Sequence, residues 1–133
     1  MSPQLHLTEI ERVALPSPDQ DKALDFYVGT LGFEKRMDET FAGGQMRWIE
    51  VVPPGSTTAI ALAPPMPGGP TSVDSGIIIS TDDIEADHKA LKEAGADVDE
   101  EIMRQEPPVP PMFQLRDPNG NSLMIVQPLD GRA

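Results

Sequence analysis

The chain has 133 residues, no cysteine and a formal net charge of −12. This length suits one domain with a hydrophobic core, and the missing cysteines exclude disulfides, thiolate metal sites and a cysteine nucleophile. The negative charge disfavours nucleic acid and anionic membrane surfaces as partners. No segment has the plan of a signal peptide or of a membrane span, so we expect a soluble, cytoplasmic protein.

The first recognisable unit is a strand followed by an amphipathic helix, within residues 13–33. Ser17 is expected to cap the helix, because Gln20 follows it at capping-box spacing. Gly32 is expected to end the helix. The apolar residues between these limits recur at helical spacing and predict one buried stripe. They are Leu24, Tyr27, Val28 and Leu31.

The same strand and helix recur at residues 76–96, which suggests an internal duplication. We predict two tandem β-α-β-β-β modules in one α+β domain: residues 8–62, a proline- and glycine-rich linker at 63–72, and residues 73–128. The predicted strands are Glu9–Leu15, Phe33–Glu39, Met46–Val52, Thr57–Leu62, Ile77–Ser80, Asp97–Ile102, Met112–Arg116 and Ser122–Gln127. The second helix is predicted at Asp83–Ala94, after Asp82 and Glu85 at capping-box spacing, and Asp117–Gly120 fits a type I turn.

Four stretches carry a family resemblance: RVALPSPDQDKALDFYVGTLGFEKR, MRWIEVVPPG, TDDIEADHKALKEAGADV and FQLRDPNGNSLMIVQP. They resemble the vicinal oxygen chelate superfamily, which includes glyoxalase I, bleomycin-resistance proteins and extradiol dioxygenases. The resemblance implies a cup-shaped mixed sheet with helices outside and the ligand on the concave side. It does not fix the activity, because this superfold hosts many functions.

The resemblance also implies where a divalent metal would lie, on the first and last strands of each module. Those positions carry Arg12, Gly76, Met124 and, within about one residue, Ala61. A guanidinium stays protonated, glycine and alanine offer no side-chain donor, and a thioether suits soft copper. We therefore expect neither the superfamily metal site nor a cofactor.

Two histidines provide the only imidazoles. His6 is expected in a solvent-facing tail, and His88 is expected to pack on the inner side of the second helix. Neither position suggests a Ser-His-Asp arrangement.

Five residues are predicted to line the cup. Trp48 and Glu50 share one strand face, while Ile49 and Val51 on the other face suggest core. Trp48 suits ligand stacking and plain packing equally well, and the methionines and Phe113 suit cavity and core equally well. Glu50 and the overall charge favour a cationic ligand, whereas a free Arg12 favours a carboxylate. The predicted lining is Arg12, Trp48, Glu50, Phe113 and Met124.

Three functions are compatible with these features. The leading hypothesis is a metal-free protein that sequesters a small organic ligand, similar in type to the bleomycin-resistance branch. The alternative is a lyase, epimerase or dioxygenase that uses a divergent site, with Arg12 as an electrophilic clamp. The third is a module that only dimerises or docks a protein. A homodimer is expected in any case, because each sheet leaves edges and an apolar surface to cover.

Overall fold

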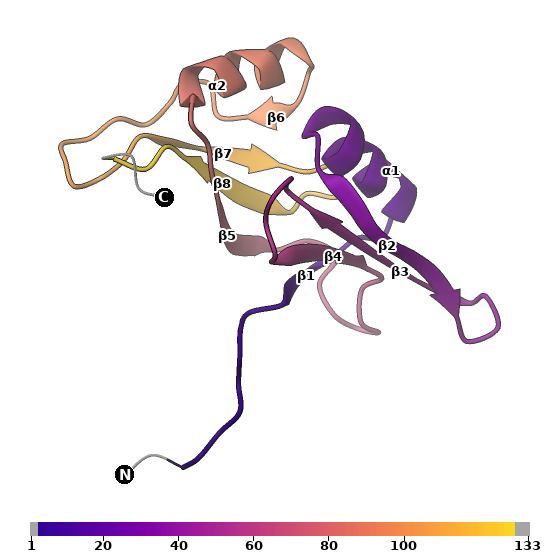
Figure 1. Cartoon of the computed structure of the whole chain (residues 1–133). Helices are drawn as coiled ribbons and strands as arrows, with labels where there is room; N and C mark the ends of the chain where they lie inside the picture. Colours follow the sequence, from indigo (N-terminus) through magenta and orange to yellow (C-terminus); the bar gives the residue numbers. More distant parts are fainter. Residues whose placement is uncertain (1–2, 130–133) are drawn as a thin grey trace.

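The computed structural model describes residues 3–129 and consists of two four-stranded mixed sheets with a helical segment on each (Figure 1). The predicted α+β class is therefore confirmed. The strands are β1 Arg12–Pro16, β2 Glu34–Phe41, β3 Met46–Val52, β4 Ala59–Ala63, β5 Asp74–Ser80, β6 Asp97–Val98, β7 Met112–Arg116 and β8 Ser122–Val126. The helical segments are α1 Gln20–Leu24, continued by the π-helix η1 Asp25–Thr30, and α2 Ile84–Glu93.

Both sheets have the same topology. The strand orders are β1-β4-β3-β2 and β5-β8-β7-β6, and in each the first and last strands of the module pair in parallel while the others are antiparallel. The cup is thus built from two separate sheets rather than from one continuous sheet. The pairing also defines equivalent positions in the two modules. Glu50 lies opposite Ala61 on β4, and Gln114 lies opposite Met124 on β8. Glu50 is therefore equivalent to Gln114, and Ala61 to Met124.

The first helix begins later than the sequence predicted. Ser17 is fully buried and extends the strand: its N–H donates to the carbonyl of Ala63 over 2.7 Å and its hydroxyl donates to the carbonyl of Leu15 over 3.1 Å. Asp19 is the N-cap instead, and its carboxylate accepts from the N–H of Lys22. The capping-box reading of Ser17 was therefore wrong, because the hydroxyl is used inside the sheet.

Two other boundaries also differ. The second helix is capped by Asp83, whose side chain accepts from the N–H of Ala86, and not by Asp82. The strand predicted up to Ile102 ends at Val98. Beyond that point the N–H of Asp99 still donates to the carbonyl of Gln114 over 3.0 Å, but the N–H of Gln114 donates to the carboxylate of Asp99, so a side chain replaces one of the two ladder bonds.

The two modules share one hydrophobic core. Its fully buried members come from both sheets and from the helices, which lie on the same side of the sheets in Figure 1. The phenolic hydroxyl of Tyr27, in η1, donates to the carboxylate of Asp117 in the second module over 2.9 Å. The amide of Asn121 donates to the carbonyl of Pro16 over 2.8 Å. The predicted turn at 117–120 therefore also fastens the modules together.

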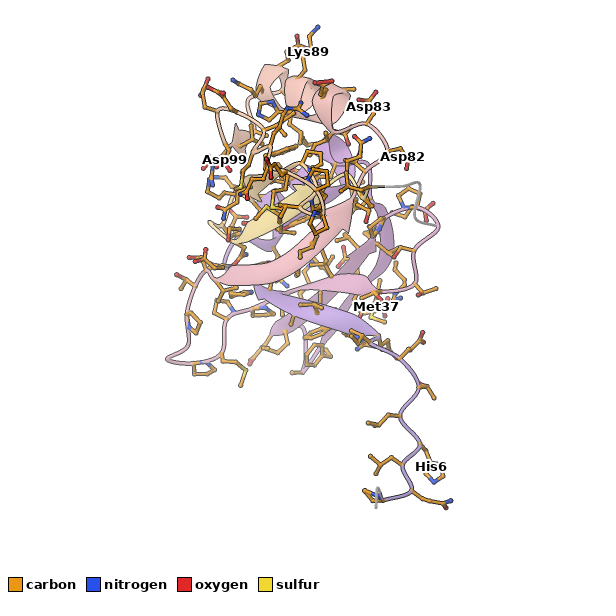
Figure 2. All side chains as sticks on the ribbon, turned by 90° about the vertical axis from the view of Figure 1, so that its left-hand side faces the viewer. His6, Met37, Asp82, Asp83, Lys89 and Asp99 are labelled. Atoms are coloured by element: carbon orange, nitrogen blue, oxygen red, sulfur yellow. The ribbon has the colours of Figure 1, made fainter. Side chains whose placement is uncertain are left out.

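The chain before β1 forms an extended arm that leaves the body on the side opposite the helices (Figure 1). Figure 2 shows His6 near the end of this arm, far from both sheets. Three apolar side chains of the arm are exposed, namely Leu5, Leu7 and Ile10. Among residues 3–129, no helix is long and apolar enough to cross a membrane.

Candidate functional site

The face of the first sheet that is turned away from α1 carries a polar centre. Along β3, Ile49 and Val51 are fully buried in the core. Strand alternation therefore turns Trp48 and Glu50 to the opposite face. This is the face to which the sequence analysis assigned both residues.

Glu50 is the centre of that face, although its side chain is only 1% exposed. One carboxylate oxygen accepts from Nε and Nη2 of Arg36, over 3.0 and 2.6 Å. The other accepts from the indole Nε1 of Trp48 over 2.8 Å and lies 3.2 Å from Nε of Arg12. We call these four residues, Glu50, Trp48, Arg36 and Arg12, the Glu50 cluster.

The cluster keeps Glu50 ionised. Burial alone would raise the pKa of its carboxyl. The hydrogen bonds from Trp48 and Arg36 and the positive charges of Arg12 and Arg36 outweigh burial, so the pKa lies below its usual range. All four contacts use the carboxylate as an acceptor, which leaves it little capacity for a cationic ligand. The preference for cations that Glu50 suggested in the sequence therefore loses its basis.

Arg36 belongs to the cluster but was not predicted. The β2–β3 register shifts between Lys35 and Met37, which is the mark of a β-bulge. The bulge turns Arg36 toward Glu50, while Asp38 pairs with Arg47. Strand alternation alone would have placed Arg36 and Asp38 on one face. Neither a glycine nor a proline marks the bulge in the sequence.

The second sheet carries an open groove of about 1420 Å³ on the corresponding face. Met112, Gln114 and Met124 form part of its floor, and a proline-rich loop borders it. Met124 thus lies in the groove, and its contact with a ligand stays a prediction. The remaining lining is Asp74, Gly76, Ile77, Ile78, Ser80, Pro107, Pro108, Pro110, Ser122, Leu123, Val126, Pro128 and Leu129.

Phe113 does not join this lining. Its side chain is fully buried, and its ring lies 4.9 Å from the ring of His88 on α2 in an edge-to-face arrangement. Because Met112 and Gln114 point into the groove, the residue between them must point to the core. The assignment of Phe113 to the cup is therefore corrected. His88 therefore lies on the inner side of α2, as expected, and its Nε2 lies 2.7 Å from the carbonyl of Asp99.

The residues at the superfamily's metal positions do not fit a divalent metal. In the register of the sheets, Ala61 corresponds to Met124, whereas Gly76 lies within a register shift between Asp74 and Ile78 and has no direct counterpart of the Arg12–Ala59 pair. The nearby carboxylate of Glu50 is held by two guanidinium groups, which would repel a cation. Within residues 3–129 no three His, Cys, Asp or Glu side chains are grouped so that they could hold a metal ion.

Comparison with known proteins places these features in context. Residues 9–125 match the family model described as Glyoxalase/Bleomycin resistance protein/Dioxygenase superfamily. No protein with a curated description matches the sequence.

Solved structures are similar over nearly the whole chain. TnmS3, an antibiotic binding protein from Streptomyces sp. CB03234, is 32% identical, with a TM-score of 0.79, and the match covers 94% of this chain and 99% of that one. A superfamily member from Sphaerobacter thermophilus DSM 20745 is 35% identical, also at 0.79, with 92% and 99% covered. A glyoxalase/bleomycin resistance protein from Streptomyces sp. CB03234 is 34% identical at 0.71, with 87% and 97% covered.

Proposed function

Since the chain belongs to the Glyoxalase/Bleomycin resistance protein/Dioxygenase superfamily, we propose that it is a metal-independent member that sequesters a small organic ligand. The ligand would lie against the faces of the sheets that are turned away from the helices. The proposal extends to a cytoplasmic homodimer, with both modules acting as a single ligand-binding domain.

The observation that carries this proposal is the occupation of the superfamily's metal positions. Arg12 stands at one of them, and it is paired with the buried carboxylate of Glu50. A protonated guanidinium cannot coordinate a metal, and the lone pairs of Glu50 already accept from Trp48, Arg36 and Arg12. Chemistry that depends on a metal in this cup would need a different set of ligands.

Two further features support binding. Apolar side chains of the second module surround the groove, and clefts of this kind bury flat organic molecules well. Trp48 offers an aromatic surface, and its indole is oriented by the bond to Glu50. A protein 32% identical to this one is described as an antibiotic binding protein, which is the same class of function.

Exposed apolar side chains support the homodimer. Met37, Phe41 and Met46 lie on the first sheet with exposed fractions of 38, 50 and 39%, and Ile78 in the groove is 65% exposed. Contiguous apolar surface on a soluble protein commonly marks an interface or a ligand site. A second copy placed against these faces would close the open groove over its ligand. Sedimentation at micromolar concentration should show a dimer, and a monomer alone would contradict this part of the proposal.

Native mass spectrometry of protein purified without chelator tests the whole proposal, because it reports the metal, the oligomer and any co-purified ligand together. We expect a metal-free protein that retains or accepts an organic molecule unchanged. Near-stoichiometric manganese, iron, nickel or zinc would instead favour the lyase, epimerase or dioxygenase alternative. A bound molecule that is converted over time would do the same.

A further inference from the structure

We propose that the guanidinium of Arg12 is the subsite for an anionic oxygen, a carboxylate or a phenolate, on a flat aromatic ligand. This inference rests on the proposed binding function and names the class of ligand that the first module selects. The two arginines of the Glu50 cluster differ in how many of their donors are already paired.

Each guanidinium nitrogen of Arg36 already donates to an acceptor of the protein. Its Nε and Nη2 both donate to one carboxylate oxygen of Glu50, and its Nη1 donates to the carbonyl of Thr57 over 3.1 Å. These three bonds fix the plane of the guanidinium. Arg36 therefore holds Glu50 in place and supplies charge, and it is tied to the protein at more atoms than Arg12 is to Glu50.

Arg12 differs because only its Nε faces Glu50, over 3.2 Å. A guanidinium carries five N–H donors, and of the two terminal nitrogens of Arg12 it is Nη2 that pairs with the carboxylate of Glu11. The Arg12 side chain is 41% exposed, whereas that of Glu50 is 1% exposed. Arg12 is thus anchored at its inner nitrogen by a buried carboxylate, while its outer edge faces solvent and the exposed Glu11.

The charge balance favours an anion at Arg12. Two guanidinium groups share the single buried carboxylate of Glu50, which leaves one positive charge in the cluster. Glu11 pairs with Arg12, but its side chain is 58% exposed. Ion pairs in such exposed positions contribute little, so a ligand carboxylate can displace Glu11.

Trp48 gives the second element of recognition. It lies two residues from Glu50 on β3, and its indole Nε1 is 2.8 Å from the carboxylate, so the ring lies directly beside Glu50. Its Nε1 bond to Glu50 restricts the indole to one orientation. A flat aromatic molecule can therefore stack on Trp48 while its acidic group contacts Arg12. Glu39 pairs with Trp48 in the β2–β3 ladder and borders this face. Its side chain is exposed to solvent, so salt screens the negative charge of its carboxylate.

The test compares an anion with its neutral isostere, 2-naphthoate with 2-naphthamide, on the full chain. The chain has one tryptophan, so the indole N–H signal in a proton–nitrogen correlation spectrum reports binding at Trp48, and calorimetry gives the affinities. We expect naphthoate to bind about tenfold more tightly than naphthamide, because a charge-assisted bond is about twice as strong as a neutral one. Arg12→Gln should reduce naphthoate to the level of naphthamide and leave naphthamide unchanged.

A second variant acts in the opposite direction, so the test does not depend on loss of function. Glu11→Gln removes the competing carboxylate and should strengthen naphthoate binding about two- to threefold. Glu9→Gln changes the net charge equally and is the matched control, which should alter the affinity less. Equal binding of both ligands, or an unchanged naphthoate affinity in Arg12→Gln, would overturn the Arg12 subsite while the binding function stands. Failure of both ligands to bind would count against the binding function itself and the subsite with it.

Discussion

The two modules of this protein share a topology but differ in the chemistry of the face turned away from the helices. The first module has a charged cluster there, whereas the second has a largely apolar groove. The contrast is found at positions that the sheet register makes equivalent. These pairs are Trp48 and Met112, and Glu50 and Gln114.

The opposite faces of the same strands are alike. Ile49 on β3 and Phe113 on β7 are equivalent in register, and both are fully buried. Because successive side chains of a strand point to opposite faces, one face can keep the core while the other changes its chemistry. The fold is therefore held by one set of alternate residues, and the ligand site is set by the other.

The largest expected effect comes from the core face of the second module. Phe113→Ala removes a fully buried ring and should lower the free energy of unfolding by about 3–5 kcal/mol. Met124→Ala, on the groove face of the neighbouring strand, should cost less than about 2 kcal/mol, because that side chain is only partly buried. Urea denaturation followed by circular dichroism measures both. A smaller loss for Phe113→Ala than for Met124→Ala would mean that the two faces of this sheet have been exchanged.

The next effect should appear on the open face of the first module. Glu50→Gln keeps the shape of the side chain but leaves two guanidinium groups without their carboxylate, and should cost about 1–3 kcal/mol. Both arginines reach solvent, with side chains 34 and 41% exposed, which limits the loss. Gln114→Ala at the equivalent place in the second module is the matched control and should change stability by no more than about 0.5 kcal/mol. Equal losses at the two positions would remove the contrast between the modules.

The contribution of Glu50 should also depend on pH. Its pKa is lowered in the folded protein, so protons bind the unfolded state more readily. The stabilisation is complete above the unfolded pKa of about 4.3 and is lost as the pH falls through the lower folded value. The difference in unfolding free energy between the wild type and Glu50→Gln should stay constant from about pH 7 to 5.5 and shrink below about pH 4. A difference that increases on acidification would contradict this assignment.

The sequence predicted features that depend on local pattern. Repeated strand–helix units, the turn at 117–120 and the alternation along β3 are short-range properties, and they predicted the α+β class and the common face of Trp48 and Glu50. Along β7 the same alternation separates Met112 from Phe113, because adjacent residues of a strand cannot both line one groove. The assignment of Phe113 to the cup was wrong because it followed residue type and not this alternation.

Other features depend on contacts between distant parts of the chain. Arg36 reaches Glu50 only because of a bulge that no residue type announces, and Ser17 remains in the sheet because Ala63 offers its carbonyl. Arg12 likewise keeps part of its positive charge for a ligand because Glu50 is shared between Arg12 and Arg36. In each case the local pattern was compatible with two outcomes, and tertiary pairing selected one.

The smallest expected effect tests the joint between the two modules. Tyr27→Phe removes the hydroxyl that donates from η1 to Asp117, across 90 positions of the chain. Asp117 keeps three donors: the backbone N–H groups of Asn119 and Asn121 and the amide of Asn121. The loss should therefore stay near the lower end of the range of about 1.5 to 3 kcal/mol for one hydrogen bond to a charged group.

Hydrogen exchange of the Tyr27→Phe variant separates two explanations. If the bond fastens one module to the other, amides of both sheets should lose protection together, because they unfold as one unit. Loss of protection confined to η1 and its neighbours would show that the modules are held by their shared core alone, and that the Tyr27–Asp117 bond only orders the helix.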